Sequence, residues 1–284
     1  MPELPEVEVL VRHLAPLLRN RTIRSVDVRR ARVLRPTSTS VLRRTLNGAR
    51  LVGLSRRGKY LLFEIQPRPG ANATVLVGHL GMTGRMYLLP SGNALPKHAA
   101  VVLDLGDEQF VFEDTRYFGR FTLDVAALND LGPEPLGPEF TAQGLREGLA
   151  RSIQSIKVKL LDQSLVAGIG NIYASEALFR ASISPRLSAR RINGELAMRL
   201  WSSIRSTLAE AIKFGSTAPL DYAGAGKREG LFYYGRVPRS PGTYEERLLV
   251  YDRKDQPCFK CGSKIRRIVQ AARSTFYCPN CQRS

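Results

Sequence analysis

Apolar positions at the start of the chain recur at the spacing of an amphipathic helix. Five of them share one helical face: Val7, Leu10, Val11, Leu14 and Leu18. Pro5 suits the first turn of such a helix, because the amide that proline lacks has no partner there in any case. Glu6 and Glu8 lie in the same turn, where acidic side chains interact favourably with the helix dipole. The pattern predicts a helix with one buried face over the first 18 residues.

From about residue 22 to residue 125, the apolar positions form short alternating or continuous runs. The runs are TIRSVDVRRARVL, ARLVGLSRRGKYLLFEI, TVLVGHLGM, AAVVLDLG and EQFVFEDTRYFGRFTLDV. Turn-forming pairs such as Asn47-Gly48 and Pro69-Gly70 separate them. This pattern predicts short antiparallel strands that build a β-sandwich or a barrel-like domain.

A segment rich in proline and glycine, LGPEPLGPEF at residues 131–140, interrupts the strand pattern and predicts a linker. Helical spacing follows it. Short helices are predicted at residues 141–150, in SIQSIKVKLLDQ (152–163) and in NIYASEALFRA (171–181). Asn193 suits the N-cap of a longer helix that ends near Gly215. The buried face of that helix would carry Leu196, Leu200, Ile204, Leu208 and Ile212.

The charge of the chain indicates a class of partner. Its 284 residues include 43 Lys and Arg against 25 Asp and Glu, which gives a net charge of +18. Residues 1–70 carry 15 basic and 5 acidic side chains, whereas residues 104–148 carry 3 basic and 10 acidic ones. Such an uneven distribution favours a positively charged face or cleft, and it indicates nucleic-acid binding. A ribosome-associated protein, or a basic composition without a specific partner, is the alternative.

The sequence lacks the features of a secreted or membrane protein. No apolar run approaches the roughly 20 residues that a membrane span needs. The first residues, MPELPEVEV, are acidic and interrupted by prolines, unlike a secretion signal. We therefore expect a cytoplasmic, nucleoid-associated protein that acts as a monomer and does not bind membranes.

The four cysteines all lie within the last 27 residues, and their spacing predicts a metal site. Two CxxC pairs, Cys258-x2-Cys261 and Cys278-x2-Cys281, are separated by 16 residues. Pairs at this spacing can present four thiolates tetrahedrally to zinc on a β-hairpin. Because four thiolates leave no coordination site for water, the predicted zinc is structural and not catalytic. The arginine-rich segment between the pairs could insert into a DNA groove, or it could be a solvated basic loop.

Pro2 and Glu3 form a candidate site for chemistry. Removal of Met1 would leave Pro2 with a secondary amine, whose pKa is lower than that of a lysine side chain. Such an amine can attack the C1′ atom of a sugar and form an iminium, which is nucleophilic covalent catalysis. Glu3 could protonate the ribose ring oxygen or shuttle protons. Taken alone, however, PELPEVE is better explained as the start of a helix preceded by prolines.

Successive segments of the chain resemble, in the same order, the signatures of the formamidopyrimidine-DNA glycosylase family. These are MPELPEVEVLVRHL, RRGKYLLFEI, GHLGMTGR, EDTRYFGRF, LGPEPLGPEF, IKVKLLDQSLVAGIGNIYASEALF and RSTFYCPNCQ, and they cover nearly the whole chain. The resemblance implies an enzyme that excises oxidised purines from double-stranded DNA and then cleaves the abasic site by β- and δ-elimination. It implies one structural zinc and no organic cofactor.

The family also implies an α+β fold. Residues 1–130 would form a catalytic domain with an N-terminal helix and an antiparallel β-sandwich, followed by the linker at 131–140. Residues 141–222 would form a helical, helix–two-turns–helix DNA-binding domain. Residues 223–245 would be a variable loop on the lesion side, and residues 246–284 a β-hairpin zinc finger.

Matching by position gives the catalytic roles that the resemblance implies. Pro2 would be the nucleophile, Glu3 its acid–base partner, and Glu6 would help to hold the N-terminus. Lys59, in SRRGKYLLF, is expected at the tip of a β-hairpin near the lesion phosphate, where its charge also lowers the pKa of the Pro2 amine. Arg273, on the zinc hairpin, would act on the phosphate of the damaged strand.

Further positions match residues that contact DNA. A base turned out of the duplex leaves a gap, and inserted side chains offset the cost of unstacking. The resemblance assigns this role to Met82, Arg116 and Phe118, although Met82 and Phe118 would by residue type alone be core residues. By the same resemblance, His79 in GHLGMTGR would be a further DNA contact.

The segment VAGIGNIYASE predicts a phosphate site at the start of a helix. Gly168 and Gly170 allow close approach of the backbone, and Asn171 suits an N-cap, beside free amides that attract a phosphate. The resemblance places Asn171 and Arg273 on the lesion-strand phosphate. It further places Lys157 and Tyr173 along the same cleft, and Glu176 in support of the helix pair.

Residues 216–244 depart from the family pattern. Members usually carry a short STLRDY…DGKPGYF…ELQVYGR passage, whereas this chain reads STAPLDYAGAGKREGLFYYGRVPRSPGTYEERLLVYDR. We therefore hypothesise that this loop changes the preferred lesion. Two alternatives stay open: an endonuclease VIII-like enzyme for oxidised pyrimidines, against which Leu4 argues, and a zinc-dependent DNA-binding relative without catalysis.

Overall fold

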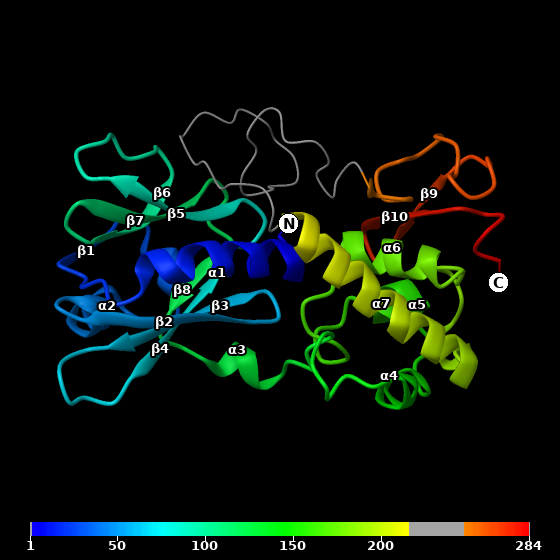
Figure 1. The fold of residues 1–284 in the computed structure, drawn as a ribbon, viewed down its shortest axis with the longest axis horizontal. Helices are drawn as coiled ribbons and strands as arrows, with labels where there is room; N and C mark the ends of the chain where they lie inside the picture. The colour runs from blue at the N-terminus through cyan, green and yellow to red at the C-terminus, as the bar shows by residue number, and fades with distance from the viewer. Residues whose placement is uncertain (1, 216–246, 284) are drawn as a thin grey trace. The chain divides into compact units, whose positions relative to one another are not determined.

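The computed structural model describes residues 2–215 and 247–283, which divide into two compact units (Figure 1). The first unit contains Pro2 and residues 6–129. The second contains residues 3–5, 130–215 and 247–283. Residues 216–244, for which we hypothesise a change in the preferred lesion, and the predicted variable loop at 223–245 lie outside the described residues. Within the described ranges, no helix has both the length and the apolar surface needed to cross a membrane.

The first unit begins with the predicted helix and is otherwise mostly antiparallel sheet. Helix α1 (Leu4–Leu18) is followed by β1 (Ser25–Val28), the short 3₁₀ helix η1 (Ala31–Leu34) and α2 (Thr39–Leu46). The remaining strands are β2 (Arg50–Arg57), β3 (Tyr60–Gln66), β4 (Thr74–His79), β5 (Gly84–Pro90), β6 (Ala99–Asp104), β7 (Glu108–Asp114) and β8 (Arg120–Thr122). The last helix of the unit is α3 (Ala126–Asn129).

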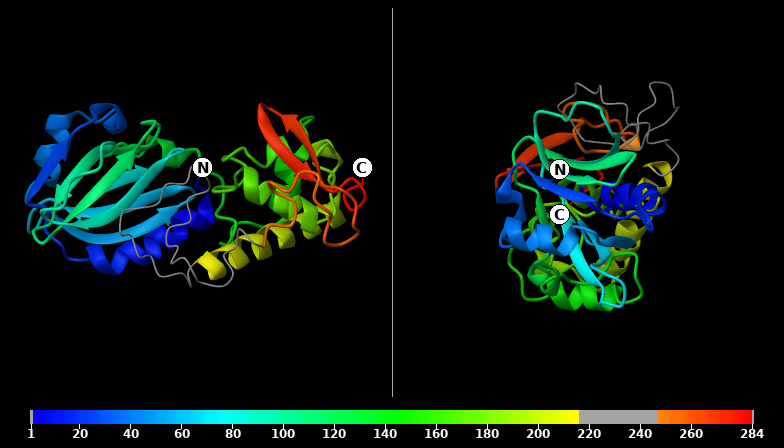
Figure 2. Two further views of the ribbon diagram at one scale, coloured as in Figure 1. Left: turned by 90° about the horizontal axis from the view of Figure 1, so that it is seen from above. Right: turned by 90° about the vertical axis from the view of Figure 1, so that its left-hand side faces the viewer.

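These strands form two four-stranded antiparallel sheets, with the orders β1-β6-β7-β5 and β2-β3-β4-β8. The sheets face one another as the layers of a sandwich, and α1 runs alongside them (Figure 2). Aromatic rings fill the space between the layers: Phe63 of one sheet lies 5.5 Å from Phe110 of the other, edge to face. The predicted apolar face of α1 joins the same core. The expected α+β fold with a β-sandwich is therefore confirmed.

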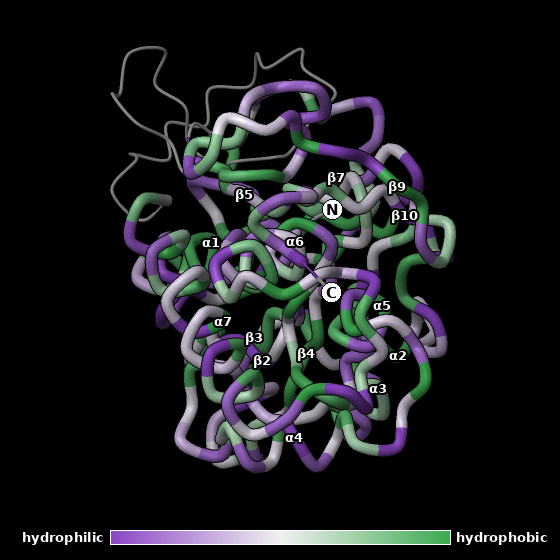
Figure 3. Tube along the Cα trace, turned by 90° about the vertical axis from the view of Figure 1, so that its right-hand side faces the viewer, coloured by the Kyte–Doolittle hydropathy of each residue, from purple (hydrophilic) through white to green (hydrophobic). Residues whose placement is uncertain are grey.

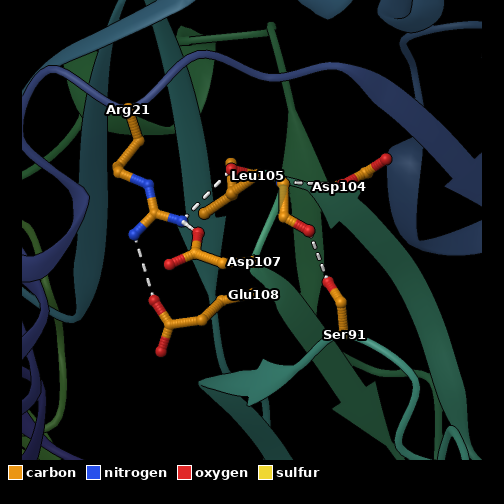
Figure 4. Close-up of polar contacts among 7 residues, drawn as sticks. Arg21, Ser91, Asp104, Leu105, Asp107 and Glu108 are labelled. Carbon is orange, nitrogen blue, oxygen red and sulfur yellow. Dashed lines mark hydrogen bonds and ion pairs between the residues drawn. The ribbon is translucent and has the colours of Figure 1, made fainter.

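Hydrophilic and hydrophobic residues alternate along much of the trace (Figure 3), as one-sided burial of helices and strands requires. Several acidic residues of the middle region serve the fold of the first unit. At the turn between β6 and β7, Arg21 contacts Asp107, donates to Glu108 at 3.0 Å and donates to the carbonyl of Leu105 at 3.1 Å (Figure 4). These contacts join the segment before β1 to the turn between β6 and β7.

The second unit is helical and ends in a β-hairpin. It contains α4 (Ala142–Leu149), α5 (Ile156–Lys159), α6 (Asn171–Arg180), the 3₁₀ helix η2 (Ala189–Arg191), α7 (Gly194–Gly215), β9 (Arg266–Gln270) and β10 (Arg273–Tyr277). Asn193 caps α7 as predicted, because its side chain accepts from the amide of Leu196 at 2.9 Å. Leu200, Ile204 and Leu208 are buried along α7, whereas Leu196 is only half-buried.

The helix predicted over 152–163 is much shorter in the structure, where α5 spans four residues. Side chains that follow α5 bind the backbone and draw it out of the helix. Asp162 accepts from the amide of Ser164 at 3.0 Å, and Gln163 accepts from the amide of Gly168 at 2.9 Å. Such local bonds compete with helical ones, and the hydrophobic spacing did not reveal them.

The proline-rich segment at 131–140 is held against the second unit. Arg205 of α7 donates to the carbonyls of Pro135 and Gly137, both at 3.0 Å. The indole of Trp201 donates to the carbonyl of Phe140 at 2.7 Å. The segment has no helix or strand, but these bonds fix its path along α7.

Candidate functional site

The N-terminus of α6 receives the side chain of Glu3, which is 1% exposed. Its carboxylate accepts from the backbone N–H of Ile172 at 2.9 Å and from that of Tyr173 at 3.3 Å. The backbone N–H of Leu4 donates to the carbonyl of Gly168 at 3.1 Å. Helix N-termini attract negative groups, and here the group belongs to the same chain. These bonds fix the residue that follows Pro2.

This arrangement corrects the prediction that Asn171 caps α6. The N-cap position is Gly170, which has no side chain, and Asn171 is the first helical residue. A Cβ on Gly170 would lie 2.3 Å from the carboxyl carbon of Glu3, so only glycine leaves room for that side chain. The close approach predicted at Gly168 and Gly170 is present, but the approaching group is the N-terminus of the chain itself. A carboxylate from residue 3 occupies the amides that we expected to bind phosphate.

A buried lysine joins α5 to α6 and to the hairpin. The ammonium of Lys157 donates to the side-chain oxygen of Asn171 and, at 3.2 Å, to the hydroxyl of Thr275 on β10. The side-chain amide of Asn171 donates in turn to the carbonyl of Ser274 at 2.9 Å. Burial lowers the pKa of Lys157 to about 8, against the opposing effect of Glu3, and the charge of Arg273 lowers it further.

Lys157 and Tyr173, which the family pattern places along a cleft, have their side chains inside the unit. Lys157 is 0% exposed and Tyr173 is 1% exposed. Arg273, by contrast, is exposed, and it directly follows the turn of the β9–β10 hairpin. Both residues of that turn, Ala271 and Ala272, have positive φ values, of 46° and 58°. The two-residue turn therefore sets the starting direction of β10, and with it the position of Arg273.

Glu176 binds the backbone of a segment that the sequence did not indicate as its partner. Its fully buried carboxylate accepts from the backbone N–H groups of Leu249, Val250 and Tyr251 at 2.8–2.9 Å. Burial raises the pKa of Glu176, whereas the three amides act in the opposite direction. The residue thus holds the segment that leads into the zinc finger against α6.

The four cysteines come together as the spacing predicts. Their sulfur atoms all lie within 4.8 Å of one another, with 3.9 Å between Cys258 and Cys281 and 3.5 Å between Cys261 and Cys278. Four thiolates bound tetrahedrally to zinc at about 2.3 Å would be about 3.8 Å apart. The residues therefore fit a structural zinc, which would fold the module around β9 and β10 without joining in the reaction.

In the first unit, Lys59 lies in the β2–β3 turn, as predicted, and is 8% exposed. His79 ends β4 and is half-buried beside the ring of Tyr60. Its Nδ1 accepts from the backbone N–H of Gly81 at 3.1 Å, which leaves Nε2 to carry the proton. Burial, followed by the charges of Lys59 and Arg120, lowers the pKa of His79 to about 4. The imidazole is consequently a neutral donor near neutral pH.

Met82, Arg116 and Phe118, which we call the wedge, lie together. The guanidinium of Arg116 stands 4.7 Å from the ring centre of Phe118, and its Nη1 is 3.3 Å from the sulfur of Met82. Met82 is 42% exposed and Phe118 is 45% exposed. They are therefore not core residues, and two large apolar side chains in solvent at one place indicate a surface that contacts a partner.

Several residues at these sites were not singled out from the sequence. Thr275 and Tyr251 come from distant segments, and Ile172 acts through its backbone N–H group, so its residue type carries no signal. Tyr173, by contrast, was predicted, and its backbone N–H also donates to Glu3. Asp114 could have been identified from the sequence, because it lies directly before the segment that carries Arg116 and Phe118. Its side chain is completely buried at the end of β7.

Three family models match the chain, and together they cover most of it. The formamidopyrimidine-DNA glycosylase N-terminal domain matches residues 1–121. The formamidopyrimidine-DNA glycosylase H2TH domain matches residues 131–220. The zinc finger found in FPG and IleRS matches residues 255–283.

Relatives and solved structures are similar over the full length. The chain is 39% identical over 283 residues to the formamidopyrimidine-DNA glycosylase of Carboxydothermus hydrogenoformans, and the match covers 100% of both chains. A Lactococcus lactis Fpg variant bound to Fapy-dG-containing DNA is 32% identical, with a TM-score of 0.86 and 100% of each chain covered. Lactococcus lactis Fpg bound to DNA with an abasic site is 33% identical, with a TM-score of 0.86 over 99% of this chain and 100% of the other.

Proposed function

Because the chain belongs to the formamidopyrimidine-DNA glycosylase family, we propose that it excises damaged bases through a Schiff base on Pro2. It is a DNA glycosylase with AP lyase activity that acts on oxidised purines in double-stranded DNA. The solved relatives bind DNA that contains Fapy-dG or an abasic site, which are the substrate of the first step and its product. As DNA is the substrate, we propose that the enzyme works at the nucleoid.

The position of Glu3 carries the proposal for the nucleophile. A secondary amine reacts only when it is held at the sugar, and the buried carboxylate of the next residue is bonded to two amides of α6. The same carboxylate is adjacent in sequence to the amine and can exchange protons during the reaction. Met1, whose removal the mechanism requires, lies outside the described residues.

The reaction begins once the damaged nucleotide has been turned out of the duplex. The amine of Pro2 attacks C1′, the bond from C1′ to the base breaks, and the departing base takes up a proton. Glu3 protonates the ring oxygen as the sugar opens, and the amine gives up its own proton, which leaves an iminium between nitrogen and C1′. Loss of a proton from C2′ then expels the 3′ phosphate, and a second elimination expels the 5′ phosphate.

The remaining residues bind and position the DNA. Lys59 and Arg273 pair with phosphates of the damaged strand, and Arg273 assists the elimination steps. Asn171 reaches the same strand from the start of α6, and His79 donates from Nε2. The wedge fills the gap left by the base. Lys157, Tyr173, Glu6 and Glu176 act from the interior, where they hold these groups in place.

Trapping with sodium borohydride tests the proposal. Reduction of the iminium should join the protein covalently to a duplex that contains 8-oxoguanine. Pro2→Gly keeps an N-terminal amine but changes its nature, so the yield of adduct should fall sharply. An adduct with unchanged yield in Pro2→Gly, or no adduct with the wild-type protein, would contradict the assignment.

Relative rates on different lesions test the hypothesis for the loop at 216–244. Single-turnover rates should be compared for 8-oxoguanine, formamidopyrimidines and oxidised pyrimidines. If the order of rates matches that of a typical family member, the loop does not change selectivity. Faster excision of oxidised pyrimidines than of purines would instead support the endonuclease VIII-like alternative.

A further inference from the structure

We propose that the buried carboxylate of Asp114 positions the wedge for insertion into the duplex. This inference rests on the proposed function, because it concerns how the enzyme keeps the damaged base outside the helix. It adds a positioning residue in the first unit, at a distance from Pro2 in sequence and without contact with the sugar under attack.

Asp114 binds both ends of the segment that carries two wedge residues. It is the last residue of β7, its side chain is 0% exposed, and it precedes Arg116 by two positions. One carboxylate oxygen accepts from the backbone N–H of Arg116 at 3.1 Å, and the other accepts from that of Gly119 at 2.8 Å. A single side chain therefore fixes both ends of the segment that presents Arg116 and Phe118.

The same carboxylate holds the segment that carries the third wedge residue. The hydroxyl of Thr83 donates to Asp114 at 2.5 Å, and it accepts from the backbone N–H of Arg116 at 3.3 Å. Thr83 directly follows Met82 in the turn between β4 and β5. Asp114 thus links two turns that lie about thirty residues apart in the sequence.

The two turns are packed too closely to move separately. Gly81 has a φ of +61°, and a Cβ at this position would lie 2.7 Å from the backbone nitrogen of Gly119 and 2.8 Å from the carbonyl carbon of Phe118. Only glycine allows this backbone contact. A shift of the segment that carries Phe118 would therefore be transmitted to the turn that carries Met82.

The exposed contacts among the wedge side chains are too weak to fix the positions of these side chains by themselves. The cation–π contact between Arg116 and Phe118 lies in solvent, where such contacts are weak. A buried carboxylate, in contrast, is costly unless its donors stay in place, so it restricts the backbone to one arrangement. Side chains ordered before binding lose less freedom when they insert, which favours the flipped state of the base.

The test compares two DNA substrates with Asp114→Asn. The first is a duplex that contains 8-oxoguanine, whose excision requires the base to be flipped and the gap to be filled. The second is a single strand that contains an abasic site, whose cleavage needs Pro2 but no wedge. Misplacement of the wedge should slow excision from the duplex by at least about tenfold. Cleavage of the single strand should stay within about twofold of the wild-type rate.

Two substitutions of Thr83 form a matched pair of test and control. Thr83→Val removes the hydroxyl that joins Asp114 to the Met82 turn, and it should slow duplex excision without affecting the single strand. Thr83→Ser keeps the hydroxyl and should behave as the wild type. If Asp114→Asn does not fold, this pair decides the question.

Wild-type duplex rates in both Asp114→Asn and Thr83→Val would overturn the inference. Equal losses on the two substrates would also overturn it, since that pattern indicates a general structural defect. Failure of the proposed function has a different signature: the wild-type protein itself would then cleave neither substrate.

Discussion

Glu3 occupies the space that a side chain on Gly170 would fill. A Cβ at residue 170 would lie 2.3 Å from the carboxyl carbon of Glu3 and 2.4 Å from one of its oxygens. The position of Glu3, and with it that of the adjacent Pro2, therefore depends on the absence of a side chain at residue 170.

Gly170→Ala is expected to displace the Glu3 carboxylate from α6. The change removes two hydrogen bonds to a buried carboxylate, each worth about 1.5–3 kcal/mol. Base excision should slow by about a hundredfold or more, because the amine of Pro2 is no longer held in position. Single-turnover kinetics on a duplex that contains 8-oxoguanine measures the effect.

Gly194→Ala is the control, because Gly194 also begins a helix and a Cβ there would meet nothing within 4 Å. It should leave the excision rate unchanged. Equal activity of the two alanine variants would show that the contact at Gly170 does not position the nucleophile.

The buried ammonium of Lys157 should give DNA binding an alkaline limit. Its pKa of about 8 lies below the ordinary value of 10.5, so the free protein loses this charge as the pH rises through 8. The charged ammonium holds Asn171, which we propose reaches the damaged strand, so the affinity for a duplex with an uncleavable abasic analogue should fall above pH 8. Fluorescence anisotropy between pH 6.5 and 9.5 measures it. Lys157→Met should show a lower affinity without this limb.

The lowered pKa of Lys157 also makes the free energy of unfolding depend on pH. Because the folded state binds the proton less tightly than the unfolded state, the relative stability is greatest above pH 10.5 and is lost as the pH falls through about 8. Lys159→Met is the matched control on α5, since Lys159 is partly exposed and paired with Asp162 at 2.7 Å. If the affinity of Lys157→Met for DNA still falls above pH 8, a group other than Lys157 causes the fall.

Removal of zinc should abolish duplex binding and leave the β-sandwich folded. Structural zinc sites contribute about 10–16 kcal/mol to the folding of small modules. Without the metal, β10 would no longer present Arg273 or hold Thr275 against Lys157. Metal analysis should find one zinc per chain, and hydrogen exchange should report loss of protection over β9 and β10 after chelation.

Restoring zinc should restore binding, and Cys258→Ser should reproduce the loss. If the zinc-free protein binds the duplex with unchanged affinity, the hairpin is not part of the DNA interface. If the sandwich unfolds together with the hairpin, the two units do not fold independently.

The sequence predicts features that depend on local spacing. The helix over the first 18 residues, the Asn193 cap and the assembly of the four cysteines all follow from neighbouring residues, and the structure confirms them. The family resemblance led to the wedge residues, and the structure brings these together on the surface. Their exposure could not be predicted from residue type, because methionine and phenylalanine are usually buried.

The features that escaped prediction depend on distant partners. Glu3 and Ile172 are 169 positions apart, and the acceptor is a side chain while the donor is a backbone amide. No pattern around Asn171 shows that its helix is already capped from the N-terminus. The same holds for Lys157, whose burial follows from the hairpin that folds over it.

Residues 3–5 belong to the helical unit, although the helix that they begin continues into the sandwich unit. The boundary between the units therefore does not fall at a single position in the sequence. A fragment that starts at residue 130 would lack the carboxylate that covers the start of α6. Exchange of whole units between homologous genes would likewise separate Glu3 from the glycine selected to accommodate it, so residues 3 and 170 are expected to be inherited together.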